Sequence, residues 1–172
     1  MKSFSEMTIA LASDHAGFPL KQKVQLFLED NGAKVKDFGC YSTESCDYPD
    51  FAHPCALAVE NGECYPGIAV CGSGEGINIT LNKHQGIRSA LCWLPDLARL
   101  ARQHNDANVL AMPGRFVTNE EAIEMVDFAL SGVHGGCAKD NIASARTMEK
   151  GGMVQYGTED NGDPLFRFSI KK

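Results

Sequence analysis

The chain has 172 residues, of which 44% are hydrophobic and 22% charged, and its formal net charge is −6. This profile fits a soluble globular protein with a core of ordinary size. The acidic balance argues against a nucleic-acid partner, which would require a basic face. No apolar run is long enough to span a bilayer, and the polar N-terminus lacks the apolar stretch of a signal peptide. We therefore expect a cytoplasmic protein with no membrane contact.

Predicted strands and helices alternate along the chain. Short apolar runs indicate strands, and apolar side chains at helical spacing indicate helices. Asn-Gly pairs at 31–32 and 61–62 end two of the helices. The predicted strands cover residues 8–12, 35–38, 67–71, 87–92 and 108–112. The predicted helices cover residues 20–28, 51–60, 77–81, 96–103, 120–130 and 142–150.

This alternation predicts an α/β fold with one parallel sheet covered on both faces by helices. We expect a single domain over residues 1–172, with a core at about 7–150 and a tail at 151–172. The tail packs either on the domain or on a partner subunit, and the sequence does not decide between them. Strand order is not readable from the sequence. In such sheets ligands bind beyond the carboxyl ends of the strands, so the residues at those ends are the candidates for a site.

Seven cysteines are scattered along the chain. An odd number in a protein without an export signal indicates free thiols. No pair has C-x-x-C spacing, so we expect no zinc site, and most of the cysteines should be small buried hydrophobes.

The third predicted strand ends in a glycine motif, Cys71-Gly72-Ser73-Gly74-Glu75-Gly76. Glycines at alternate positions let backbone N–H groups converge on one point, which makes a nest for a phosphate or a developing oxyanion. The Gly-Lys-Ser/Thr of a P-loop is absent. A flexible strand–helix turn is the alternative interpretation. Cys71 faces this nest, where negative charge is stabilised, so it is a candidate base or nucleophile; a buried structural cysteine is the alternative.

Polar residues follow other strands. Asp14 and His15 come after the first strand, and a helix cap and a surface histidine are their alternative roles. His104 ends the fourth predicted helix. It either transfers a proton in catalysis or interacts favourably with the negative end of the helix dipole. Arg115 follows the fifth strand and is suited to pair with a phosphate. Pro49 and Asp50, the expected cap, start the second helix, whereas Tyr48 has no evident structural duty and is a further site candidate.

Five segments together resemble the sugar-phosphate isomerase family that includes the ribose-5-phosphate isomerase B and galactose-6-phosphate isomerase proteins. They are residues 13–17, 47–50, 71–76 with Asn82 and Lys83, 86–90, and 104–110, in family order within residues 7–150. The run His104-Asn105-Asp106 is more similar to the ribose 5-phosphate branch. The resemblance implies a three-layer, Rossmann- or flavodoxin-like α/β/α sandwich with a five-stranded parallel sheet. It also implies a homodimer or homotetramer with the site at the subunit interface, and no metal or cofactor.

The resemblance also implies roles for the candidate residues. Cys71 would move a proton between C1 and C2 of the sugar, while Ser73 and the backbone of the glycine motif hold the enediolate oxygen. His104 would assist ring opening. The remaining substrate-binding candidates are Asp14, His15, Tyr48, Gly72, Gly74, Glu75, Gly76, Asn105 and Arg115, of which His15 and Arg115 would contact phosphate. Some family members carry a glutamate base at the position of Ile77, which leaves Cys71 as the base here.

The sequence departs from the family pattern at two positions where the family has phosphate-binding residues. The family's two arginines, four residues apart after a Gly-Gly, are replaced by Cys137 and Asn141. We expect Lys139 or Arg146 to compensate.

Three functions follow in order of preference. The first is interconversion of ribose 5-phosphate and ribulose 5-phosphate. The second is the same chemistry on a six-carbon sugar phosphate, allose or galactose 6-phosphate. The third is a non-catalytic sugar-phosphate-binding module. A cysteine hydrolase is a weaker alternative, because no histidine–acid pair is fixed beside a cysteine.

Overall fold

The structure is a computed structural model that describes residues 7–131, 135–136, 153–158 and 164–168. The chain divides into two compact units, Met1–Leu130 and Ser131–Lys172. The single domain expected over residues 1–172 stays a prediction. Within the described residues, no helix combines the length and the apolar character needed to cross a bilayer. The cytoplasmic location also stays a prediction.

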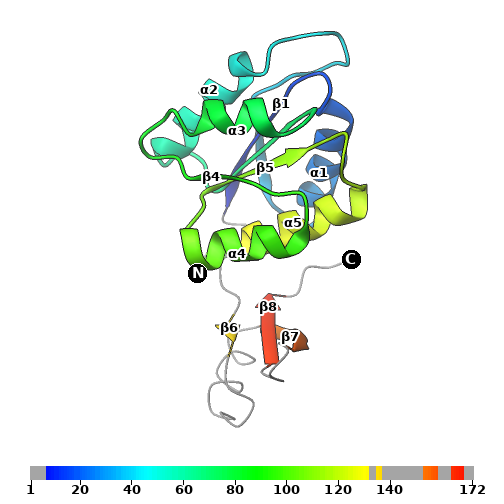
Figure 1. The fold of residues 1–172 in the computed structure, drawn as a ribbon, viewed down its shortest axis with the longest axis vertical. Helices are drawn as coiled ribbons and strands as arrows, with labels where there is room; N and C mark the ends of the chain where they lie inside the picture. Colours follow the sequence, from blue (N-terminus) through cyan, green and yellow to red (C-terminus); the bar gives the residue numbers. More distant parts are fainter. Residues whose placement is uncertain (1–6, 132–134, 137–152, 159–163, 169–172) are drawn as a thin grey trace. The chain divides into compact units, whose positions relative to one another are not determined.

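The first unit contains the five-stranded parallel sheet that the sequence predicts (Figure 1). Its strands are β1 (Thr8–Ser13), β2 (Lys34–Asp37), β3 (Gly67–Cys71), β4 (Ser89–Leu91) and β5 (Val109–Pro113). They lie in the order β2-β1-β3-β5-β4, and every neighbouring pair is parallel. The Rossmann-like α/β prediction is therefore confirmed, with β3 at the centre.

Five helices cover the two faces of this sheet. They are α1 (Phe18–Asp30), α2 (Pro49–Glu60), α3 (Glu75–Leu81), α4 (Pro95–Asn105) and α5 (Asn119–Ser131). Helices α2 and α3 pack together on one face, and Figure 1 shows α1, α4 and α5 on the other. The fold therefore has three layers.

Alternation along the strands explains how the layers pack. Because successive side chains of a strand point to opposite faces, each strand supplies one set of residues to each layer. The α2/α3 face is built mainly from small residues, which let helices approach the sheet closely. Its strand members are Ala10, Ala12, Ala69, Cys71, Val109 and Ala111. Cys71 is thus the last core residue of β3, at the point where the chain leaves the sheet.

The structure corrects the starts of two helices. Asp50 was expected to cap the second helix, but Tyr48 occupies the N-cap position and its carbonyl accepts the first helical hydrogen bond, from Ala52 (2.9 Å). Pro49 then takes the first helical position, where its missing N–H costs nothing. Helix α3 begins at Glu75, two residues before the predicted start, because Gly74 adopts a left-handed conformation (φ +77°) and caps it.

The second unit contains a small antiparallel sheet that the sequence reasoning missed. Its strands are β6 (Gly135–Gly136), β7 (Met153–Thr158) and β8 (Pro164–Phe168), in the order β6-β8-β7. The two longer strands belong to the predicted tail. The helix expected at 142–150 lies outside the described residues.

Candidate active site

The glycine motif leaves β3 at the carboxyl edge of the sheet. Cys71 is only 3% exposed and packs in the core beneath α2 and α3. At Gly74 a Cβ atom would lie 2.4 Å from Leu91 Cδ1 and 3.0 Å from the backbone nitrogen of Pro113. Both the positive φ and this crowding require glycine. The motif is therefore folded tightly against β4 and β5.

Three loops converge at this edge, because β1, β3 and β5 are neighbours in the sheet. The Gly114 N–H donates to the Cys71 carbonyl (2.9 Å), and the Arg115 N–H donates to the Gly72 carbonyl (3.2 Å). From the other side, the Asp14 N–H donates to the Val70 carbonyl (3.2 Å). The residues predicted after the first, third and fifth strands thus lie side by side.

Asp14 and His15 are both held by defined partners. Asp14 is 7% exposed, and its Oδ1 accepts a hydrogen bond from the Gly17 N–H (2.8 Å), so it shapes the turn before α1. His15 is half-buried, and its Nδ1 lies 3.2 Å from the Cys46 nitrogen and 3.1 Å from the Cys46 carbonyl oxygen. The His15 ring is therefore fixed through Nδ1 by the loop that precedes α2. Nothing in the sequence spacing pointed to this contact.

Tyr48 reaches the glycine motif from α2. A Cβ atom on Gly76 would lie 2.5 Å from Tyr48 Cζ and 2.8 Å from its hydroxyl oxygen. The phenol ring therefore lies directly on the backbone of Gly76, at the edge that the three loops form.

Charged and hydroxyl groups line the open side of the motif. Ser73, Glu75 and Arg115 are exposed. The guanidinium of Arg115 lies close to Gly72: its Cζ and Nε are each 3.6 Å from where a Cβ on that glycine would stand. A cationic side chain thus borders the backbone of the glycine motif, an arrangement that favours an anionic ligand.

Ile77 is fully buried in the α2/α3 core. Its side chain has no group that transfers a proton. The glutamate base of some relatives therefore has no counterpart at this position.

His104 and Asn105 lie at the opposite edge of the same sheet. They end α4, and β5 begins four residues after Asn105, at Val109. Just before that strand, the Asn108 carbonyl accepts a hydrogen bond from the Gly67 N–H (2.9 Å). Gly67 opens β3 and Cys71 closes it. Four residues of strand span about 13 Å. Within one chain, the structure therefore does not bring His104 to Cys71.

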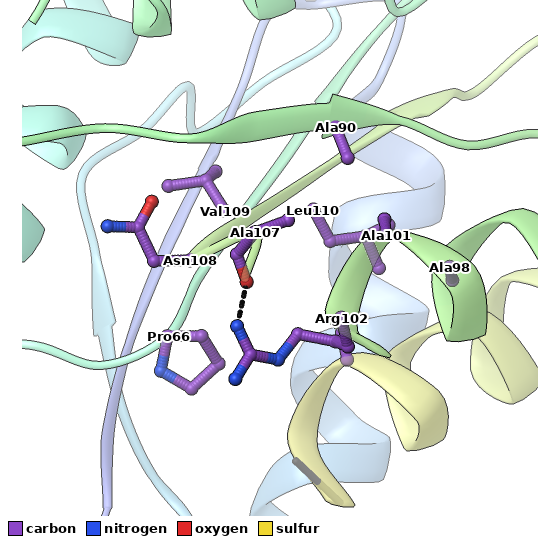
Figure 2. A pocket seen from close by; sticks show the side chains of 10 residues that line it. Pro66, Ala90, Ala98, Ala101, Arg102, Ala107, Asn108, Val109 and Leu110 are labelled. Carbon is purple, nitrogen blue, oxygen red and sulfur yellow. Dashed lines mark hydrogen bonds between the residues drawn. The ribbon is translucent and has the colours of Figure 1, made fainter. Parts of the chain in front are cut away.

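A small cavity lies on the side of the sheet where α4 ends (Figure 2). Its volume is about 10 Å³, room for about one water. Alanines of α4 and β4 line it with Val109 and Leu110 of β5, together with Arg102, which donates to the Ala107 carbonyl. This cavity is far too small for a sugar phosphate, so it is not the site. Within the described ranges, no group of three or more His, Cys, Asp and Glu residues is arranged to hold a metal ion.

The six described cysteines are free thiols, as predicted, and all except Cys46 are buried. Burial raises the pKa of Cys55 and of Cys92 to about 12, which disfavours their thiolates. Four predicted positions, Lys139, Arg146, Cys137 and Asn141, lie outside the described residues.

Comparisons with known proteins agree with this geometry. The sequence profile of the family described as Ribose/Galactose Isomerase matches residues 9–143. The chain is 46% identical to ribose-5-phosphate isomerase B of Escherichia coli over 143 residues, which are 83% of this chain and 96% of that protein.

Solved structures give the same result. Ribose 5-phosphate isomerase of Thermotoga maritima matches with a TM-score of 0.72 at 45% identity, covering 84% of this chain and 96% of its own. Ribose-5-phosphate isomerase B of Mycoplasma genitalium, solved with bound ribulose-5-phosphate, matches with a TM-score of 0.70 at 38% identity, covering 83% and 92%. The chain belongs to the ribose/galactose isomerase family.

Proposed function

We propose that this protein is an isomerase that interconverts ribose 5-phosphate and ribulose 5-phosphate. The observation that carries the proposal is the convergence of the loops after β1, β3 and β5 around Cys71 and the glycine motif. Relatives that are 40–46% identical and named as ribose-5-phosphate isomerase or sugar phosphate isomerase support it.

Cys71 is the proposed base. Its thiolate takes the proton from C2 of the open-chain aldose, and the electron pair of that C–H bond forms the C1=C2 bond of an enediolate. The proton returns to C1 while the hydroxyl proton of O2 passes to O1, which gives the ketose. Ser73 and the backbone N–H groups of the glycine motif hold the oxygens on which negative charge develops. These steps use groups of the chain itself.

The sugar and its phosphate extend away from Cys71 over the three loops. Asp14 and Tyr48 are the proposed contacts to the sugar hydroxyls; in support, Tyr48 lies against Gly76 of the glycine motif. His15 and Arg115 are the proposed phosphate contacts, since each is a cationic or potentially cationic group at this edge. Lys139 or Arg146 is proposed to add a charge in place of the arginines missing at 137 and 141.

His104 and Asn105 are proposed to act in the site of a second copy. Ring opening requires a proton donor near the furanose oxygen, and His104 lies at the wrong edge of its own sheet for that task. Two copies in a closed symmetric pair can each lend His104 to the other's Cys71 site. The proposed assembly is accordingly a homodimer or a homotetramer.

Turnover by the purified full chain tests the proposed function. Ribose 5-phosphate should be converted to ribulose 5-phosphate, detected by the absorbance of the ketose derivative, and allose 6-phosphate should be converted more slowly. Preference for the six-carbon sugar would reassign the substrate. Binding of both sugars without turnover of either would identify a non-catalytic module.

A further inference from the structure

The end of α4, which carries His104, is held by an arginine from another part of the chain. Arg88 lies in the segment between α3 and β4, and its Nε donates a hydrogen bond to the Asn105 carbonyl (2.5 Å). The last carbonyls of a helix have no partner inside it, and a cation there is favoured by the helix dipole. Arg88 therefore fixes the backbone immediately after His104.

Arg88 is itself clamped by the side chain of Asn108. Asn108 Oδ1 accepts from the Arg88 N–H (2.8 Å), and Asn108 Nδ2 donates to the Gly86 carbonyl (2.7 Å). The backbone adds a further bond, from the Asn108 N–H to the Arg88 carbonyl (3.1 Å). Both ends of one amide side chain are used to hold the segment from 86 to 88 against the start of β5.

Glu60, the last residue of α2, holds the same segment from the other side. Its Oε1 accepts from the Gly86 N–H (2.8 Å), and its Oε2 lies 3.3 Å from His84 Nδ1. The Gly86 hydrogen bond is the main cause that lowers the pKa of Glu60, so this carboxylate stays charged at neutral pH. A continuous set of hydrogen bonds thus runs from α2 through the 84–88 segment to the end of α4.

We propose that Arg88 is a positioning residue for ring opening: it sets the direction in which α4 presents His104 and Asn105 to the site of a second copy. This inference rests on the proposed function, in which His104 opens the furanose ring. Arg88 acts through the Asn105 carbonyl and needs no contact with substrate. A second arginine, on α4, provides the contrast: among the described residues, the Arg99 guanidinium bonds to the side chains of Asp96 (3.4 Å) and Gln103 (3.0 Å) on its own helix.

Two reactions separate positioning of His104 from general damage to the protein. Turnover of ribose 5-phosphate begins with a closed ring and requires ring opening. Exchange of the C1 hydrogen of ribulose 5-phosphate with D₂O, followed by proton NMR, begins with an open chain, since its C5 oxygen carries phosphate. That exchange requires Cys71 and the glycine motif but no ring opening.

The test uses Arg88→Met, which keeps the apolar stem and removes the donors, and Arg88→Lys, which keeps a cation and a donor. Arg88→Met should lower kcat on ribose 5-phosphate by about tenfold or more, because a misplacement of a catalytic group by about 1 Å can cost about 10²-fold. Its KM should stay within about twofold and its C1 exchange rate should stay near the wild-type rate. Arg88→Lys should recover most of the loss. Arg99→Met, the matched control on α4, should behave as wild type in both reactions.

An Arg88→Met variant that turns over ribose 5-phosphate at the wild-type rate overturns the inference. So does a variant that loses both reactions equally, since that marks a general structural role. These results leave the proposed function standing. A wild-type protein with no isomerase activity overturns the proposed function and this inference together.

Discussion

The phenol ring of Tyr48 lies against the backbone of Gly76, so closely that a single methyl group on that glycine would stand 2.5 Å from the ring. Tyr48 is the N-cap of α2, whereas Gly76 is the second residue of α3. The contact therefore joins the starts of two helices at the carboxyl edge of the sheet. It explains why a residue without an evident structural duty in the sequence stands at this position.

This contact predicts that Gly76→Ala is costly because of Tyr48. Overpacking of this kind costs about 1–3 kcal/mol of unfolding free energy. Removal of the ring in Tyr48→Ala should make the same glycine substitution much cheaper, so the two changes should be strongly non-additive. Urea unfolding of the two single variants and the double variant measures the coupling. An equal cost of Gly76→Ala in both backgrounds would show that the ring is not the obstacle.

A pH-dependent contribution to stability is predicted at the start of α5. Thr118 and Glu121 form a capping box: the Thr118 N–H and hydroxyl donate to Glu121 Oε2 (2.8 and 3.0 Å), and the Glu121 N–H donates to the Thr118 hydroxyl (3.2 Å). These bonds from Thr118 lower the pKa of Glu121. A lowered folded-state pKa means that the contribution is present above the unfolded pKa and is lost as the pH falls through the folded value.

Glu121→Gln should therefore lower Tm at pH 7 and have a smaller effect at pH 3, where a larger fraction of the wild-type carboxyl is protonated. Thr118→Ala should cost about 1 kcal/mol at pH 7, as for other helix caps. Differential scanning calorimetry at the two pH values measures both effects. A Glu121→Gln difference in Tm that is the same at both pH values would contradict the assignment.

The fold was readable from the sequence because its central strands carry continuous apolar runs, and residues 67–71 were predicted with the bounds that the structure gives. The order of the strands could not be predicted from the sequence, since it depends on contacts between distant segments. Lys21 shows another limit: it is fully buried, and its Nζ contacts both carboxylate oxygens of Asp37 (2.6 Å) and the Cys40 carbonyl (2.6 Å). A lysine in an amphipathic helix is predicted to be exposed to solvent, because the sequence does not show that a carboxylate such as Asp37 lies beside it.

In the candidate site, too, some features were predicted from the sequence and others are known only from the structure. Local motifs identified Cys71, the glycine motif and the polar residues after β1 and β5, because parallel strands bring their carboxyl ends together. They did not reveal that Tyr48 covers Gly76 or that His15 is held by Cys46. Nor did they show that His104 and Cys71 lie at opposite edges of one sheet, which is the observation that motivates a site shared between two copies.

A shared site predicts complementation between two inactive variants. In a dimer of one Cys71→Ser chain and one His104→Ala chain, one site lacks both residues and the other has both. Equal amounts of the two variants, unfolded together and refolded, give half mixed dimers with one intact site each, so about a quarter of the wild-type activity should return. Each variant refolded alone is the control. Activity of the mixture no greater than the average of the two controls would place both residues in the same chain's site.

The role of Cys71 predicts a loss that no other described cysteine should share. The proton that moves is bound to carbon beside a carbonyl and is weakly acidic, so its removal requires a thiolate, and a serine hydroxyl has no comparable ionised fraction. General-base catalysis contributes about 10²–10⁴-fold, and Cys71→Ser should lose at least that much of kcat. Binding of ribose 5-phosphate, measured by isothermal titration calorimetry, should persist because Ser73, the glycine motif and Arg115 remain.

Cys92→Ser is the matched control, since Cys92 is also buried, 1% exposed, and directly follows β4 as Cys71 ends β3 in the same sheet. Burial raises the pKa of Cys92 to about 12, so its thiolate is scarce at neutral pH and its replacement should leave kcat near the wild-type value. The exchange of the C1 hydrogen of ribulose 5-phosphate with solvent gives the sharper comparison, because it reports proton abstraction alone. Exchange at the wild-type rate in Cys71→Ser would exclude Cys71 as the base, whatever the overall turnover.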